Sequence, residues 1–122
     1  MEFEINGNKW KIIEVPQEDF WEYDGELDKM NKREYYFGRC HFDLQTIWLW
    51  KDQSEGQKKK TLYHELMHCY RGSFLSFSEL DNQPEDVWCD LVANSHDIIT
   101  KIVEDYFKNR KGKVEWKITN VK

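Results

Sequence analysis

The sequence predicts an α+β domain in which a small antiparallel sheet packs on two helices. Segments up to Trp50 alternate apolar with polar residues and are rich in β-branched and aromatic side chains, as is typical of strands. From Thr61 onward, apolar residues recur at helical spacing. A length of 122 residues suits one hydrophobic core, so residues 1–122 are expected to form a single domain.

A β-hairpin is expected at the N-terminus. Phe3 and Ile5 alternate with glutamates and are followed by Asn6 and Gly7, a pair that favours the tight turn of a hairpin. The apolar residues from Trp10 onward would belong to the second strand.

A second pair of strands is predicted over residues 35–42 and 46–50, with a turn near Asp43. Residues 17–31, which lie between the two strand pairs, are compatible with a short helix or with an irregular connection. Residues 51–60 are polar and are expected to form a loop that leads into a helix.

The first predicted helix carries the motif described below. Its cap would be Ser54 together with Gln57, or Thr61. It is expected to end near Arg71 and Gly72, because glycine commonly terminates helices.

A longer second helix is predicted after Pro84, a residue suited to a first helical turn. It would end near Arg110, and Gly112 would close it. Residues 114–118 alternate like a strand, and are expected as a strand or as an irregular arm. The predicted buried face of this helix contains Trp88, Leu91, Ile99 and Ile102.

The most specific chemical signal is the run from His64 to His68, which reads His-Glu-Leu-Met-His. Residues four positions apart lie on the same face of a helix, so His64 and His68 can direct imidazole nitrogens at one metal ion. Glu65 projects about 100° around the helix from His64, where it can act as the general base for a metal-activated water. Zinc is the expected cofactor, because this motif is typical of zinc sites that lower the pKa of water to about 7.

A catalytic zinc site commonly has a third protein ligand. Glu85 is the preferred candidate, because it lies at the edge of the buried face of the second helix, in line with Val92 and Ile99. On a helical wheel of the same helix, Asp86 points toward solvent. A residue in the first turn can deviate from the ideal helical position, so Asp86 stays an alternative. His96 lies about 16 Å further along the helix, so it could replace Glu85 but not act beside it.

Composition excludes several classes of function. The net charge of −5 argues against a nucleic-acid partner. No apolar run approaches the roughly 20 residues of a membrane span, so no membrane partner is expected. The N-terminus lacks the basic and apolar segments of a signal peptide, and a cytoplasmic location is therefore expected.

Three cysteines are an odd number, which fits reduced thiols better than a disulfide scaffold. Cys69 and Cys89 are expected to be small buried hydrophobic residues. Cys40 and His41 form a weak candidate for a metal site, since adjacent strand residues point to opposite faces.

The segment from Thr61 to His68, preceded by Thr46 to Trp50, resembles the active helix of small zinc metallopeptidases of the ImmA/IrrE-like type and of minimal phage metallopeptidases (zincins). In those families a ligand glutamate follows, with apolar residues on one helical face. Glu85, followed by Trp88 and Val92, is similar to that arrangement. The resemblance also implies a sheet whose edge strand binds an extended peptide, with Thr46 to Trp50 as the expected edge.

The predicted function is therefore a zinc-dependent metallopeptidase with Glu65 as its general base. The resemblance implies a cytoplasmic protein substrate, such as a regulator or repressor. One alternative is a zincin-fold metal-binding module that cleaves little and acts through protein–protein interaction, and another is a structural protein with a fortuitous motif. Candidates for stabilising the oxyanion are Tyr63, Tyr70, Arg71 and His96.

Overall fold

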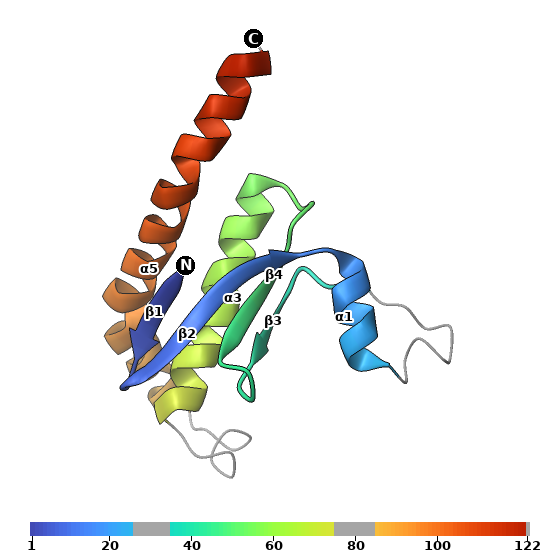
Figure 1. Ribbon diagram of the computed structural model, residues 1–122. Helices are drawn as coiled ribbons and strands as arrows, with labels where there is room; N and C mark the ends of the chain where they lie inside the picture. Colours follow the sequence, from blue (N-terminus) through green and yellow to red (C-terminus); the bar gives the residue numbers. More distant parts are fainter. Residues whose placement is uncertain (26–34, 75–84, 122) are drawn as a thin grey trace.

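The computed structural model describes residues 1–25, 35–74 and 85–121, and it describes the side chains of the last helix over residues 88–109. The architecture is α+β, as predicted, with a four-stranded sheet in the order β1-β2-β4-β3 (Figure 1). The strands are β1 (Glu2–Ile5), β2 (Asn8–Val15), β3 (Gly38–His41) and β4 (Thr46–Trp50). The helices are α1 (Gln17–Asp24), α3 (Glu55–Phe74) and α5 (Glu85–Val121).

The N-terminal hairpin forms as predicted. β1 pairs antiparallel with β2, and the turn residues Asn6 and Gly7 have φ angles of 51° and 81°. Positive φ at both central positions is the requirement of a type I′ turn, which asparagine and glycine meet with little strain. The hairpin directs Trp10 and Ile12 into the core.

The sheet is mixed, because β2 pairs parallel with β4 and Ile12 lies opposite Ile47. The expected antiparallel arrangement holds for β1 with β2 and for β3 with β4, but not for this central pairing. The chain between β2 and β4 contains α1 and β3, which is long enough for a crossover. Apolar alternation is the same in both strand directions, so the sequence pattern does not distinguish them.

β4 lies between β2 and β3, so the prediction that Thr46–Trp50 is the edge strand is wrong. Ile47 and Leu49 are fully buried on one face, and Trp48 contacts Phe20 of α1 on the other. A strand that is covered on both faces is favoured in the interior of a sheet. The edge strand on this side of the sheet is β3.

A short helix, α1, occupies the first part of the undecided segment 17–31, and residues 26–34 lie outside the described residues. Phe20 of this helix is fully buried between the rings of Tyr36 and Trp48, with centroid distances of 5.4 Å to each. This aromatic contact holds α1 on the face of the sheet opposite α3.

α3 begins at the earlier of the two predicted caps and ends later than predicted. The backbone N–H of Gln57 donates to Ser54 Oγ at 3.1 Å, which is one of the two predicted caps. The helix therefore includes most of residues 51–60, which were expected to be a loop. Gly72 does not end the helix: a Cβ atom there would lie 2.2 Å from the Phe42 ring, so glycine permits the close packing of that ring.

α5 also continues beyond its predicted end near Arg110, and residues 114–118 are helical rather than strand-like. A single glycine such as Gly112 lowers helix stability by only about 1 kcal/mol relative to alanine, so it need not terminate a helix. Cys89 was expected to be buried, but it is exposed on α5 because it faces away from the packed side of the helix.

The core lies between one face of the sheet and the pair α3 and α5, which pack against each other (Figure 1). The predicted buried face of α5 is confirmed at Ile99 and Ile102, whereas Trp88 and Leu91 are half-buried. None of the helices in the described part of the chain is both long and apolar enough to cross a bilayer.

Candidate metal centre

The motif lies in the middle of α3, where the helix presents different faces to the sheet, to α5 and to solvent. The face toward the sheet contains the fully buried side chains of Leu62, Leu66 and Cys69. His64 and His68 lie on the exposed face, and Glu65 lies between the two faces with only 6% of its surface exposed. Helical periodicity thus places the two imidazoles on one face of the helix and the carboxylate on the neighbouring face, next to them.

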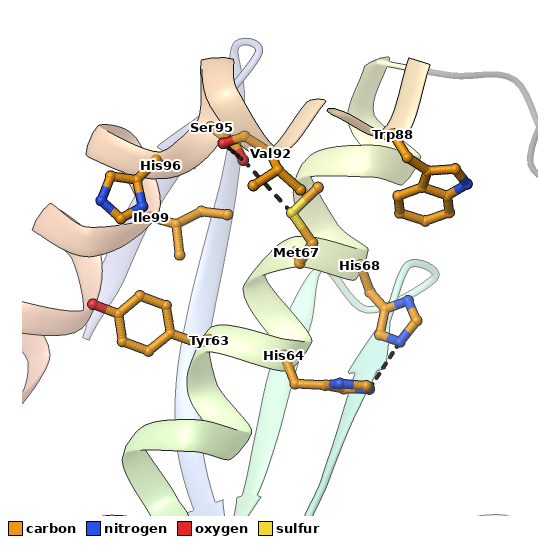
Figure 2. A pocket seen from close by; sticks show the side chains of 9 residues that line it. All are labelled: Tyr63, His64, Met67, His68, Trp88, Val92, Ser95, His96 and Ile99. Atoms are coloured by element: carbon orange, nitrogen blue, oxygen red, sulfur yellow. Dashed lines mark hydrogen bonds between the residues drawn. The ribbon is translucent and has the colours of Figure 1, made fainter. Parts of the chain in front are cut away.

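His64 and His68 approach each other closely, with their Nε2 atoms 3.1 Å apart (Figure 2). Two nitrogens bound tetrahedrally to one zinc ion, each at about 2.0–2.1 Å, would be about 3.3 Å apart. The ligand atoms of His64, Glu65 and His68 all lie within 4.8 Å of one another. The donor set and its spacing therefore fit a metal ion with little movement of either histidine.

The electrostatic surroundings favour the metal-binding form of His68. Partial desolvation of the ring by neighbouring atoms, the nearby His64 and the charge of Arg71 all lower the pKa of His68, although the residue as a whole is exposed. A metal binds the neutral imidazole, so a lowered pKa keeps this ligand available at neutral pH.

Glu65 has the protonation behaviour expected of a general base that works near neutral pH. Burial raises the pKa of Glu65 to about 7, and the positive charge of Arg39 opposes this shift only in part. A group with a pKa near the working pH can both accept and return a proton. The carboxylate is therefore suited to proton transfer beside the histidine pair.

β3 reaches Glu65 because residue 38 is glycine. A Cβ atom on Gly38 would lie 2.6 Å from Cγ2 of Thr61 and 3.2 Å from Cγ of Glu65. Neither Gly38 nor Arg39 was predicted from the sequence to be part of the site. A glycine within a strand is nevertheless a known sign of close backbone approach, so Gly38 carried a usable signal.

Among the described residues, hollows lie on two sides of the cluster. The first is a groove between β3 and α3, made of two cavities of about 400 and 370 Å³ that share Tyr36, Gly38, His64 and Glu65 in their walls. The second is a cavity of about 490 Å³ between α3 and α5, which has both His64 and His68 in its wall (Figure 2). A substrate in either hollow would reach the histidine pair.

The predicted third ligands occupy different positions on α5. Glu85 and Asp86 are the first residues of this helix, and their side chains lie outside the described residues. His96 is exposed, and the group of ligand atoms found among the described residues does not include it. It does line the cavity between α3 and α5. The third ligand therefore stays a prediction.

The four candidates for stabilising an oxyanion are not equally placed. Tyr70 is buried in the core, and Arg71 stacks on the ring of Trp88 at 4.3 Å. Tyr63 and His96 line the cavity between α3 and α5, whose wall also contains the histidine pair. These two side chains have direct access to a substrate in that cavity.

The cysteines do not extend the cluster within the described residues. Cys40 packs against the core, whereas the ring of His41 lies 4.2 Å from that of Trp48 on the opposite face, so the two diverge as predicted. The Cys69 thiol and burial raise the pKa of Cys40. A thiol that stays protonated is a poor metal ligand.

Comparison with protein families, curated proteins and solved structures finds no match to this chain. The function is therefore inferred from the geometry of His64, Glu65 and His68 and of the hollows around them.

Proposed function

We propose that this protein is a zinc-dependent metallopeptidase that hydrolyses peptide bonds of a protein substrate. The observation that carries the proposal is the position of Glu65, a buried carboxyl group, beside two histidine nitrogens that lie 3.1 Å apart. A structural zinc site is closed by four protein ligands. Here both histidines are exposed and face open hollows, which supports a catalytic centre instead.

His64 and His68 would hold the ion through Nε2, with Glu85 as the proposed third ligand and Asp86 or His96 as alternatives. Bound zinc supplies Lewis acidity, which polarises a carbonyl group and lowers the pKa of water. Zinc is the default ion, although other divalent transition ions suit the same ligand types.

Glu65 is proposed to act as the general base. Its carboxylate takes a proton from the attacking water and returns the proton to the leaving amine. The side chain is held against Gly38 on β3, so the carboxylate faces the groove in which a peptide would lie.

The substrate is proposed to bind as an extended strand along β3. This strand pairs with β4 on one side and ends the sheet in the described part of the chain. A peptide added to such an edge is fixed by backbone hydrogen bonds, and here it would lie in front of Glu65. A regulator or repressor is proposed as the physiological substrate from the family resemblance alone.

The test is the Glu65→Gln variant. It keeps the shape of the side chain but removes the base, so cleavage of a protein or peptide library should fall by about 10²–10⁴-fold. Zinc content, measured by elemental analysis, should equal that of the wild type.

Full cleavage by a zinc-loaded Glu65→Gln variant would contradict the role of Glu65. Zinc binding by a wild type that cleaves nothing would instead favour the alternative function, a metal-binding module that acts through protein–protein interaction.

A further inference from the structure

Aromatic rings form a row at the end of the sheet where β4 ends and α1 packs. The row consists of Trp21 of α1, Trp50 of β4, and Tyr35 and Phe37 of the segment that leads into β3. Taken in the order Trp21, Tyr35, Trp50 and Phe37, neighbouring rings have centroids 5.5, 6.2 and 6.2 Å apart. Tyr35 is 72% and Phe37 is 52% exposed, so this aromatic row belongs to the surface and not to the core.

The backbone beneath the aromatic row is held in place, although two of the rings are exposed. The backbone N–H of Tyr36 donates to the side-chain oxygen of Gln17 on α1 at 3.1 Å. The backbone oxygen of Phe37 accepts hydrogen bonds from the backbone N–H of Trp50 and from the side chain of Gln53, both at 2.8 Å. The rings are thus carried by a fixed scaffold, which lowers the entropic cost of binding a ligand.

The spacing and inclination of the rings suit a chain in the polyproline II conformation. Neighbouring rings are inclined to each other at 80°, 53° and 42°, so the row is ridged and not flat. A polyproline II chain advances about 3.1 Å per residue, so two of its residues span about 6.2 Å, which matches the spacing of the rings. Proline-rich segments bind surfaces lined with aromatic rings, because their conformation is formed before binding and little entropy is lost.

The charge beside the aromatic row indicates which residues would flank the prolines. α1 contains four carboxylates and no lysine or arginine. Glu18 and Glu22 are exposed, and Glu18 lies one helical turn from Trp21 on the same side of the helix. Arginine or lysine next to the prolines would be attracted to these carboxylates. Single-stranded nucleic acid also stacks on aromatic rings, but its backbone is held by positively charged grooves, so the acidic helix favours a basic peptide.

The aromatic row is continuous with the groove along β3. Tyr35 and Phe37 line the same cavity of about 400 Å³ as Gly38, His64 and Glu65. Tyr35 precedes Gly38 by three residues, which corresponds to roughly 10 Å of extended chain. A peptide that pairs with β3 in front of Glu65 would therefore reach the row about three residues from its scissile bond.

We propose that the aromatic row is a docking site for a proline-rich segment with flanking arginine or lysine residues, carried by the protein substrate. The docking itself needs neither zinc nor Glu65, whereas the assignment of the segment to the substrate rests on the proposed function. Docking at this surface selects a protein by a segment that lies outside the cleaved bond.

Binding is tested on the full, zinc-loaded Glu65→Gln chain by titration calorimetry. The probe is an acetylated hexaproline amide with one arginine at each end. The comparison ligands are a glycine–serine peptide of the same length and charge, hexaproline with glutamate ends, and single-stranded oligothymidine. The glycine–serine peptide and oligothymidine should bind at least about tenfold more weakly than the probe, and the glutamate-ended peptide about two- to fivefold more weakly.

Variants of the aromatic row locate the binding. Tyr35→Ala or Phe37→Ala should weaken binding of the probe by about tenfold. Leu44→Ala is the matched control, because Leu44 is as exposed as Phe37, at 52%, and lies in the turn at the other end of β3. Glu18→Gln combined with Glu22→Gln should weaken binding of the probe by about two- to fivefold and should not weaken binding of the glutamate-ended peptide.

A spectroscopic readout locates the ligand directly. The chain has six tryptophans, so the spectrum of their indole N–H groups is simple, and Trp50→Phe assigns the signal of Trp50. The probe should shift this signal, and the glycine–serine peptide should not. A Trp50 signal that the bound probe leaves unchanged would overturn the docking site.

Cleavage tests whether the docked segment belongs to the substrate. A peptide that the wild type cleaves is extended by the arginine-flanked prolines, about three to five residues to the N-terminal or to the C-terminal side of the cleaved bond. In one of the two orientations the KM should fall by about tenfold with kcat unchanged, and Tyr35→Ala should abolish this gain.

The outcomes separate the two proposals. Binding of the probe at the row by a protein that cleaves nothing would support the docking site and overturn the proposed function. Cleavage without any gain from the prolines in either orientation would support the function and overturn the assignment of the segment to the substrate. Equal binding of the glycine–serine peptide, tighter binding of oligothymidine, or equal behaviour of Tyr35→Ala and Leu44→Ala would overturn the docking site.

Discussion

The backbone of β3 passes α3 at a distance that only glycine permits at position 38. A Cβ atom there would lie 2.9 Å from the backbone oxygen of Trp48 and 2.6 Å from Cγ2 of Thr61. The backbone oxygen belongs to the neighbouring strand and cannot move independently of it. Gly38 thus sets the separation between the edge strand and the carboxylate of Glu65.

Gly38→Ala should therefore lower the free energy of unfolding by about 1–3 kcal/mol, because the added methyl group overpacks the contact between β3 and α3. Urea denaturation measures this change. Peptidase activity should fall as well, since β3 would shift relative to Glu65.

Gly56→Ala provides the matched control. Gly56 lies in the first turn of α3, and a Cβ atom there would have no neighbour within 4 Å. Alanine at this position should raise the free energy of unfolding by about 0.5–1 kcal/mol. A Gly38→Ala protein as stable as Gly56→Ala would contradict the assigned close approach.

At the scale of the elements, α1 and β3 are joined by an ion pair. Arg39 donates to both carboxylate oxygens of Asp24, at 2.5 and 3.0 Å. Hydrogen bonds from Arg39 hold the pKa of Asp24 below its ordinary value, and a further one from Tyr36 adds to the effect. The helix thereby helps to fix the edge strand from the face opposite α3.

This pair makes stability depend on pH. Because the pKa of Asp24 is lowered in the folded state, its stabilisation is present above the ordinary pKa of about 4 and is lost as the pH falls through the lowered value. Asp24→Asn should lower the free energy of unfolding by about 1 kcal/mol at pH 7, with a smaller difference below pH of about 4. Urea denaturation with a chelator present, repeated across this pH range, measures the effect.

Asp105→Asn is the comparison for an exposed pair. Asp105 lies 3.4 Å from Lys101 in an ion pair whose side chains are 43% and 77% exposed. Loss of this ion pair should change the free energy of unfolding by less than about 0.5 kcal/mol at any pH. Equal effects of the two substitutions would show that Asp24 does not stabilise the fold through Arg39.

At the scale of the whole molecule, local signals in the sequence predicted the elements but not their arrangement. Asn6 and Gly7 predicted the hairpin, and the motif was correctly assigned to a helix for which Ser54 was one of two predicted caps. The parallel pairing of β2 with β4 and the edge position of β3 were not predicted. Strand direction and order depend on contacts between distant segments, which the alternation of apolar residues does not encode.

The candidate site likewise has a part that local sequence predicts and a part that depends on contacts between distant segments. The spacing of His64 and His68 predicted their adjacency, because helical geometry alone decides it. The contributions of Gly38 and Arg39 come from β3 and arise only when the strand packs on α3. The third ligand depends on how the start of α5 is oriented, so Glu85 stays a proposal.

Zinc stoichiometry tests the central claim most directly. Purified wild-type protein, dialysed without chelator, should retain about one zinc ion per chain, and His64→Ala or His68→Ala should lose most of it. His96→Ala serves as the control and should retain zinc if Glu85 is the third ligand. A wild type without bound metal, or histidine variants that bind zinc as tightly as the wild type, would contradict the metal centre and the peptidase function with it.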